Sequence, residues 1–311
     1  MAAEDARILV VGAAGLDIKA QTPVLLEHGV SVPGQIHLSL GGSGRNIAEN
    51  LARLELETLL FSVVGDDPAG RYLVEATGRV GVDVGQVLLS KGRHHTGAYL
   101  AMRGPDGDTE WALDDMEIME LISPEYIDAR RALFPGANTI VLDMNVPPPT
   151  VRAIYGLARQ YGITVCADPT SRHLAARLLP YLEQTAIITP NQSEAEVLCG
   201  CTIRSADDAA QAALQLVAQG VGLAIITLGD RGLVYASDEE RGHIPALEVE
   251  AVDVTGIGDA LTATVVFGLI NGFPVDEAIR LGVTAAALTL TCPESVCPDL
   301  SLERLYDKLM L

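Results

Sequence analysis

The sequence contains few cysteines, and they do not form a pattern typical of a disulfide framework or a strong zinc site. The 311 residues include five cysteines, an odd number, and no pair of them has C-x-x-C spacing. The acidic N-terminal segment leads directly into an apolar run and lacks the plan of a secretory leader. We therefore expect buried or incidental thiols and a cytoplasmic protein.

Long apolar runs and excess positive charge are also missing. The longest apolar stretches contain polar residues and are too short for a membrane span. The net charge of -20 opposes binding to nucleic acid or to anionic membrane surfaces. With 49% hydrophobic and 20% charged residues, the composition is that of an ordinary globular protein. The length favours one large domain with a small appendage.

Short apolar runs alternate with helical patterns along the chain. Each run is apolar throughout, as expected of strands that helices cover on both faces. Helical patterns at 149–162 and 205–220 lie between such runs, and the second begins after Ser205 and ends at Gly220. This alternation predicts a doubly wound α/β fold with a mostly parallel sheet and helices on both faces. The expected strands are 8–11, 59–64, 139–142, 163–167, 186–189 and 223–228.

Two segments instead have the pattern of strands with one exposed face. Residues 34–40 alternate apolar and polar, and residues 97–115 read as a hairpin with its turn at 104–107. Such strands do not belong in a sheet that is covered on both faces. We predict a single domain over 1–311 with a small β lid formed by about 16–40 and 95–120. A lid of this kind caps an active site or forms a dimer surface.

Glycine-rich turns mark two candidate ligand sites in the first part of the chain. In 41-GGSGRN-46, Gly41 and Gly42 allow close approach of backbone to a ligand, and Asn46 suits a sugar hydroxyl; a plain tight turn is an equal alternative. Asp17 follows the glycines of 8-ILVVGAAGLD-17 too closely for a dinucleotide fingerprint. We interpret Asp17 as an acceptor for two neighbouring hydroxyls, placed at the end of the first strand.

Two further motifs follow expected strands in the second half. Asn191 and Glu194 in 189-TPNQSEAE-196 have the spacing to hold a hydrated Mg²⁺, although a helix capping box explains the same residues more simply. Thr227 and Gly229 form another strand-to-glycine turn that could bind phosphate oxygens. Alone, this second turn is a weak signal.

The segment 253-DVTGIGD-259 places glycines at the start of a long apolar helix. A P-loop would continue with lysine and Ser/Thr, but Asp259 stands here instead. The backbone N–H groups of Gly256, Ile257 and Gly258 can stabilise phosphate charge at the helix N-terminus. Asp259 is then free to take a proton from an attacking hydroxyl, although an acidic residue favoured by the helix dipole is the simpler alternative.

Taken together, these motifs resemble the signatures of the ribokinase-like (phosphofructokinase-B) carbohydrate kinase family. The glycines of 41–46 with Asn46, the 191–194 and 227–229 motifs, and 253–259 occur in the family's order and span essentially the whole chain. Several stretches resemble the members that phosphorylate pseudouridine, namely GLDIK, GGSGRNIAENLA, DDMEI, LDMN, ADPTS and PDLS.

The resemblance implies a kinase that transfers the ATP γ-phosphate to a primary hydroxyl of a small sugar or nucleoside. Asp259 would be the base and the 256–258 turn the anion hole. The substrate would be held by Asp17, Gly41, Gly42, Asn46, Asp143 and Asn145. Asn191 and Glu194 would organise Mg²⁺ and phosphate, and Thr227 and Gly229 would line the ATP side. From the half-exposed strands of the lid we also expect a homodimer formed through it.

Many relatives are activated by a monovalent cation such as K⁺ beside the anion hole, which here implies Asp253, Thr255 and the loop 291–298. Glu294 and two cysteines in that loop depart from the family's pattern. Ribose or purine nucleosides are alternative substrates, and a sugar- or nucleoside-sensing protein on the same fold is the non-enzymatic alternative. Asp114 or Asp115 could enter the site if the lid closes, and Trp111 is expected to pack in the lid.

Overall fold

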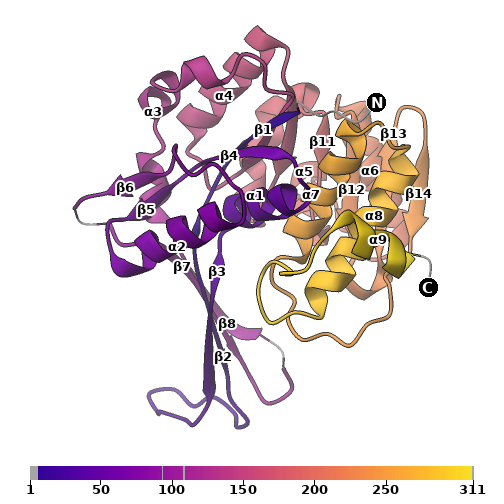
Figure 1. Ribbon diagram of the computed structural model, residues 1–311. Helices are drawn as coiled ribbons and strands as arrows, with labels where there is room; N and C mark the ends of the chain where they lie inside the picture. The colour runs from indigo at the N-terminus through magenta and orange to yellow at the C-terminus, as the bar shows by residue number, and fades with distance from the viewer. Residues whose placement is uncertain (1–5, 93, 108, 310–311) are drawn as a thin grey trace.

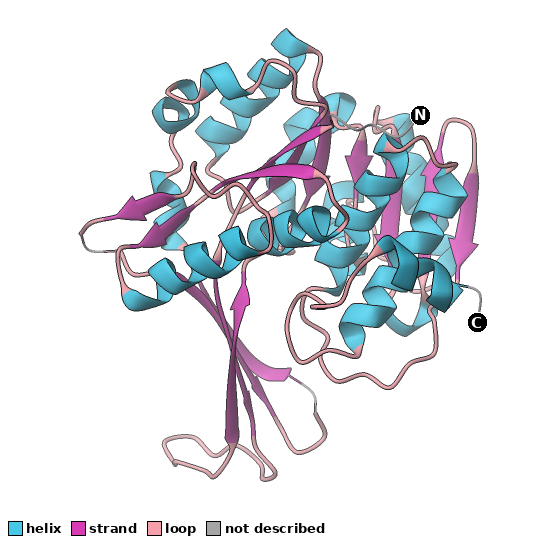
Figure 2. Ribbon diagram, viewed as in Figure 1, coloured by secondary structure: helices cyan, strands magenta, loops and turns pink. Residues whose placement is uncertain are grey.

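The computed structural model describes residues 6–92, 94–107 and 109–309. Its main element is an eight-stranded sheet with the order β14-β13-β12-β11-β10-β9-β1-β4 (Figures 1 and 2). The neighbouring strands from β12 to β4 are parallel, and β13 and β14 add antiparallel strands at one edge. The strands are β1 Arg7–Val11, β4 Glu57–Phe61, β9 Thr139–Asp143, β10 Thr164–Asp168, β11 Ile187–Ile188, β12 Leu223–Thr227, β13 Leu233–Ser237 and β14 Arg241–Ile244.

Helices cover both faces of this sheet, as the continuous apolar runs predict. Alternate residues of β1 point to opposite sides, so Leu9 lies in one buried core cluster and Ile8 in the other. The first cluster includes side chains of α3 to α6, and the second includes side chains of α1 and α7 to α9. The helices are α1 Ser43–Arg53, α2 Pro68–Arg79, α3 Pro124–Asp128, α4 Pro148–Tyr161, α5 Gln192–Cys199, α6 Ala206–Ala218, α7 Ile257–Ile270, α8 Val275–Leu290 and α9 Leu302–Leu309, with 3-10 helices η1 Glu117–Leu121, η2 Arg131–Leu133, η3 Ala175–Gln184 and η4 Gly229–Arg231.

The expected strand over 59–64 is two strands that belong to different sheets. The chain leaves the main sheet after β4, and residues Val63–Gly65 form β5, which pairs with β6 (Leu88–Ser90). Ser62 between them is fully buried. An apolar run alone does not reveal this division, because both strands are buried and have the same composition.

The lid is a four-stranded sheet of order β3-β2-β7-β8 that projects from the main domain (Figure 1). Its strands are β2 Gly15–Gln21, β3 Gln35–Gly41, β7 Gly97–Arg103 and β8 Thr109–Asp115. They lie in the predicted segments, apart from Gly15 and Gly41 at the strand ends. The segment after β8 departs from the prediction, because Ile118 and Met119 of η1 are buried in the core of the main domain.

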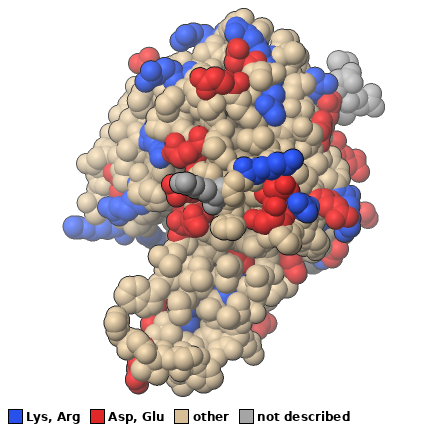
Figure 3. All heavy atoms as spheres, turned by 90° about the vertical axis from the view of Figure 1, so that its left-hand side faces the viewer, with Lys and Arg blue, Asp and Glu red and all other residues tan. Residues whose placement is uncertain are grey.

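The two faces of the lid differ in composition. Asp17, Tyr99 and Asp114 are paired across β2, β7 and β8, so they share the face that borders the cavity described below. The opposite face carries two cross-strand rows of apolar residues: Ile18, Ala20, Ile36, Leu38, Leu100, Met102, Trp111 and Leu113. Figure 3 shows few charged side chains on the projecting part of the molecule.

None of the helices in the described segments is long and apolar enough to cross a membrane.

Candidate active site

A cavity of about 580 Å³ lies between the lid and the carboxyl ends of the main-sheet strands. This is where open α/β sheets bind their ligands. Residues from all the predicted motifs meet there, although the motifs are far apart in the sequence. The predicted site residues that line it are Asp17, Gly42, Asn46, Asn145, Asn191, Glu194, Thr227, Thr255, Gly256, Gly258 and Asp259.

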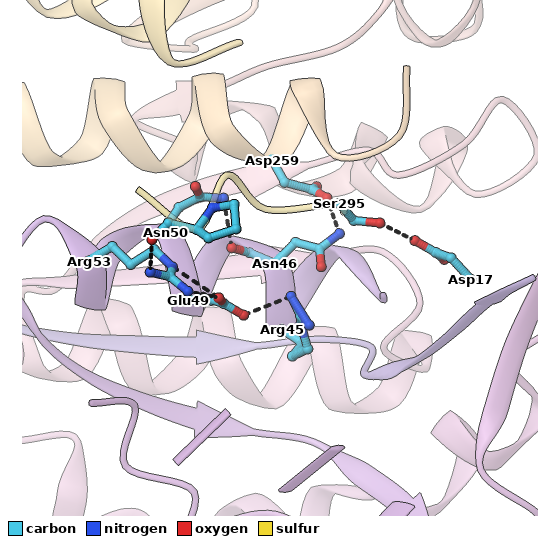
Figure 4. Close-up of polar contacts among 9 residues, drawn as sticks. Asp17, Arg45, Asn46, Glu49, Asn50, Arg53, Asp259 and Ser295 are labelled. Carbon is cyan, nitrogen blue, oxygen red and sulfur yellow. Dashed lines mark hydrogen bonds and ion pairs between the residues drawn. The ribbon is translucent and has the colours of Figure 1, made fainter. Parts of the chain in front are cut away.

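Asp259 lies in the first turn of α7 with its carboxylate at the cavity and only 8% of the residue exposed. Asn46 of α1 donates a hydrogen bond from Nδ2 to Asp259 Oδ2 at 2.7 Å (Figure 4). Burial raises the pKa of Asp259 to about 7, the nearby carboxylates of Asp17 and Asp143 add to the rise, and the Asn46 hydrogen bond opposes it. The site therefore contains a carboxyl group that can exchange a proton near neutral pH.

The turn before Asp259 is held tightly against the C-terminal loop. Gly256 is the N-cap of α7 with φ of 82°, a conformation that favours glycine. A Cβ atom at Gly256 would lie 1.9 Å from the carbonyl oxygen of Ser295. The first N–H groups of a helix have no partners within the helix. Gly256 and Gly258 line the cavity, so the N-terminus of α7 borders it, whereas Ile257 does not line it.

Asp17 belongs to β2 of the lid, whereas the sequence suggested a place at the end of the first strand. Its Oδ2 accepts a hydrogen bond of 2.5 Å from Ser295 Oγ, which links the lid to the C-terminal loop (Figure 4). Burial raises the pKa of Asp17, while the Ser295 hydrogen bond and the Lys19 charge lower it. Gly41 lies against Asp17, since a Cβ atom at Gly41 would be 2.2 Å from Asp17 Oδ1. Gly41 therefore makes room for Asp17 and does not itself line the cavity.

Asp143 does not line the cavity, although Asn145 does. Its Oδ2 accepts hydrogen bonds from the backbone N–H groups of Ala13 at 2.6 Å and Gly44 at 2.9 Å. Its Oδ1 accepts one from the N–H of Asn145 at 2.9 Å. Both oxygens are thus used to join the end of β9 to the loop after β1 and to the start of α1. Asp143 organises the backbone of the site, and the predicted direct contact of its side chain with substrate does not fit this geometry.

Asn191 and Glu194 form the capping box that the sequence offered as the simpler explanation. Asn191 Oδ1 accepts from the Glu194 N–H at 3.1 Å, and Glu194 Oε2 accepts from the Asn191 N–H at 2.8 Å. Both residues also border the cavity, so the two explanations are compatible. Thr227 lies beside them because its backbone pairs with that of Asn191. Gly229 begins η4 and does not line the cavity.

Asp168, to which no sequence motif assigned a role, ends β10 and borders the cavity. Burial raises its pKa well above the ordinary value, and the carboxylates of Asp259 and Glu194 add to the rise. Two features of the sequence could have indicated a role for Asp168: it follows an apolar run, and it lies in the ADPTS stretch at 167–171. Five acidic side chains border the cavity, namely Asp17, Asp114, Asp168, Glu194 and Asp259. The charges of Asp259 and Glu194 repel that of Asp168, so this side of the cavity favours a bound cation.

Asp253 does not line the cavity, and its carboxylate is already paired with two cationic side chains. Lys19 Nζ lies 3.0 Å from Oδ2, and Arg103 Nη2 lies 3.3 Å from Oδ1. A further cation beside this carboxylate would be repelled by both positive groups. The monovalent-cation site at Asp253 and Thr255 stays a prediction, and the two ion pairs of Asp253 oppose it.

A second network that the sequence did not reveal supports α1. Arg45 is 3% exposed, and its guanidinium lies 2.8 Å from Glu49 Oε2. Glu49 Oε1 also pairs with Arg53 at 2.7 Å, and Arg53 donates to the carbonyl of Pro298 in the C-terminal loop (Figure 4). This chain of charges, buried at Arg45 and Glu49, ties the helix that carries Asn46 to the loop that carries Ser295.

The lid contributes Tyr99, Arg103 and Asp114 to the cavity. Asp114 is therefore the one of the two neighbouring acids that borders the site, whereas Asp115 does not line it. Trp111 is 67% exposed on the apolar outer face of the lid. It does not border the cavity.

Comparison with known proteins agrees with this geometry. The profile of the pfkB family carbohydrate kinases matches residues 5–299. The chain is 30% identical over 296 residues to the pseudouridine kinase of Escherichia coli K12, covering 95% of this chain and 94% of the relative. It is 25% identical over 291 residues to the guanosine-inosine kinase of Exiguobacterium acetylicum, covering 93% of this chain and 96% of that one.

The fold also matches that of solved ribokinases. The structure of Arabidopsis thaliana ribokinase with ribose and ATP superposes with a TM-score of 0.85 at 22% identity, covering 100% of each chain. The predicted ribokinase-like α/β fold with a separate small sheet is thereby confirmed. From its sequence, its fold and these likenesses, the chain belongs to the pfkB family of carbohydrate kinases, phosphotransferases that act on a hydroxyl group of a sugar or nucleoside.

Proposed function

We propose that this protein transfers the γ-phosphate of ATP to the 5′-hydroxyl of a ribonucleoside, with pseudouridine as the preferred substrate. The observation that carries the proposal is the Asp259 carboxylate, which is buried at the cavity beside the N-terminus of α7 and held by Asn46. A base and an anion-stabilising turn are thereby adjacent, as transfer to a hydroxyl requires.

The residues have distinct parts in this proposal. Asp17 and Asn46 hold the ribose, and Asp259 accepts the proton as the 5′-oxygen bonds to the γ-phosphorus and the bond to the ADP oxygen breaks. The N–H groups of the 256–258 turn stabilise the charge of the transferred group. Thr227 borders the ATP side with Asn191 and Glu194. Catalysis in phosphoryl transfer is mostly positioning and electrostatic stabilisation, which this set of residues supplies.

Mg²⁺ fits the acidic side of the cavity. Asp168 and Glu194 offer the oxygen ligands that this ion prefers, and Mg²⁺ usually binds one or two carboxylates, substrate phosphates and water. Within 6–92, 94–107 and 109–309, no group of three or more His, Cys, Asp or Glu side chains could hold a metal ion, and a site of this kind does not need one. When bound, the ion neutralises phosphate charge that would otherwise repel the carboxylates.

The choice of pseudouridine is supported by the similar Escherichia coli enzyme and by the chemistry of the cavity. The base of pseudouridine is joined through carbon, so it has one more N–H donor than uridine. The lid carboxylate of Asp114 and the amide of Asn145 both border the cavity and can accept hydrogen bonds. A base that offers two N–H donors suits such acceptors better than one that offers a single donor.

We also propose that the protein is a homodimer formed through the lid. Ile36, Leu38, Trp111 and Leu113 are 69%, 60%, 67% and 70% exposed on the outer apolar face of the lid. A contiguous exposed apolar face of this kind marks an interaction surface. A second copy of the lid would cover it with an equally apolar surface.

An ATP-consumption assay with pseudouridine, uridine, adenosine, inosine and ribose tests the substrate. We expect the highest kcat/KM with pseudouridine, and a 5′-phosphate product by NMR. A clear rate on ribose or on a purine nucleoside, with only background on pseudouridine, would replace the proposed substrate by that alternative. If none of the five compounds leads to ATP consumption, a sensing protein on the same fold is favoured.

A further inference from the structure

An ion pair between the lid and the main domain adjoins the chain segment that leads into the N-terminal turn of α7. Lys19 of β2 places Nζ 3.0 Å from Asp253 Oδ2, and the two side chains are only 6% and 9% exposed. The sequence has two other lysines, Lys91 and Lys308. Lys91 lies exposed, so its charge is solvated and screened, whereas that of Lys19 is fixed against one carboxylate.

The other oxygen of Asp253 holds the chain that leads into the turn. Asp253 Oδ1 accepts hydrogen bonds from the backbone N–H of Thr255 at 2.8 Å and from Thr255 Oγ1 at 2.7 Å. Thr255 is followed by Gly256, where α7 begins. The position of the Asp253 carboxylate therefore determines where the N-terminal turn starts.

A monovalent cation at Asp253 would supply positive charge to this carboxylate and so fix the turn. Here the Lys19 ammonium and the Arg103 guanidinium already supply that charge, one to each oxygen. Lys19 and Arg103 therefore leave no place for an added cation. They hold the Asp253 carboxylate in position, as a bound cation would. Because Lys19 and Arg103 belong to lid strands β2 and β7, the charge reaches the turn from the lid.

We infer that Lys19 takes the place of an activating monovalent cation, so phosphoryl transfer by this protein does not depend on added K⁺. Lys19 is a positioning residue in this inference, because it acts on the turn through Asp253 and Thr255 and does not line the cavity. The inference rests on the proposed kinase function.

The test compares wild type, Lys19→Met and Lys19→Arg in KCl and in choline chloride at equal ionic strength, with Lys91→Met as the control. Two quantities are measured: kcat with ATP and pseudouridine, and the melting temperature without substrate. Wild type, Lys19→Arg and Lys91→Met are expected to give the same kcat and melting temperature in both salts. Lys19→Met is expected to lose about 10²-fold in kcat in choline chloride, because the turn is misplaced. KCl should restore part of that rate and raise the melting temperature of this variant.

The inference is contradicted if wild type requires K⁺ for activity or melts higher in KCl than in choline chloride. It is also contradicted if Lys19→Met keeps the wild-type rate in choline chloride. If Lys19→Met does not fold, the kcat and melting temperature of wild type and Lys19→Arg in the two salts still test the inference. If wild type consumes no ATP with any nucleoside, the proposed function fails, and the melting temperatures alone test the replacement of the cation.

Discussion

The chemistry of the site depends on how burial and charge act on single carboxylates. Asp259, Asp168 and Asp17 all have raised pKa values, and burial is the largest cause in each case. Their surroundings nevertheless differ: Asp17 is hydrogen-bonded to Ser295, Asp259 to Asn46, and Asp168 to the backbone N–H of Thr170. Similar groups can therefore serve different purposes within one cavity.

The raised pKa of Asp259 predicts a dependence of the rate on pH. A base must be ionised to accept a proton, and the pKa of this group is raised to about 7. We expect kcat/KM for the nucleoside to fall about tenfold for each pH unit below that pKa and to level off above it. Steady-state rates across this range at saturating ATP measure the profile. A profile that is flat through neutral pH would show that no group with this pKa is required.

The same shift has an opposite effect on stability. The ordinary pKa of 3.8 applies to the unfolded chain, so between 3.8 and about 7 the folded protein holds more protons at Asp259. The contribution of this group to the free energy of unfolding therefore decreases as the pH rises through that window. The ionised form that the proposed reaction needs is the form that destabilises the fold.

For single residues, the sequence identifies a functional candidate when the residue lies within a recognisable local motif. Asp259, Asn46, Asn191 and Glu194 all lie in recognisable local patterns, and the structure brings them to one cavity. Lys19 and the Arg45–Glu49 pair could not be given roles, because these depend on partners or packing that no local pattern shows. Asp143 lies at the expected strand end, but only the three-dimensional structure shows that its oxygens bind backbone.

The elements of the main domain follow from the apolar runs and the caps. The helix expected to begin after Ser205 is α6, where Ser205 and Asp208 form a capping box. The division of 59–64 between two sheets was not predictable, since pairing partners are chosen by the rest of the chain. The same reason explains why no single segment predicts the antiparallel edge strands β13 and β14.

The contacts of the C-terminal loop were the hardest to predict from the sequence. For this loop, residues 291–298, the sequence predicts only a cation site. In the structure, Ser295 reaches Asp17, its carbonyl oxygen excludes a side chain at Gly256, and Pro298 accepts from Arg53. An irregular segment has no periodic pattern, so its contacts cannot be inferred from composition.

For the molecule as a whole, the lid has two faces of different composition. One face supplies Asp17, Tyr99 and Asp114 to the cavity, and the other is apolar and exposed. If the outer face is covered in a dimer, the lid strands that carry Lys19 and Arg103 are held in place by the partner copy. Assembly and the geometry of the active site would then be linked.

This proposal predicts that a charge on the outer face of the lid disrupts the dimer. Trp111→Glu would bury an unpaired carboxylate in the interface, which is strongly unfavourable. We expect wild type to elute with twice the monomer mass in size-exclusion chromatography with light scattering, and Trp111→Glu to elute as a monomer. Leu179→Glu is the control, because Leu179 is 46% exposed on η3 of the main domain. A monomeric wild type would refute the proposed assembly.

The central claim, that Asp259 takes the proton from the attacking hydroxyl, is tested most directly by Asp259→Asn. The amide keeps the shape of the side chain but cannot accept the proton as a carboxylate does. We expect kcat to fall by about 10²–10⁴-fold, while the Kd for ATP measured by titration stays at the wild-type value. Asp207→Asn, a change at an exposed position of α6, should leave both quantities unchanged. Turnover by Asp259→Asn close to that of wild type would contradict the account.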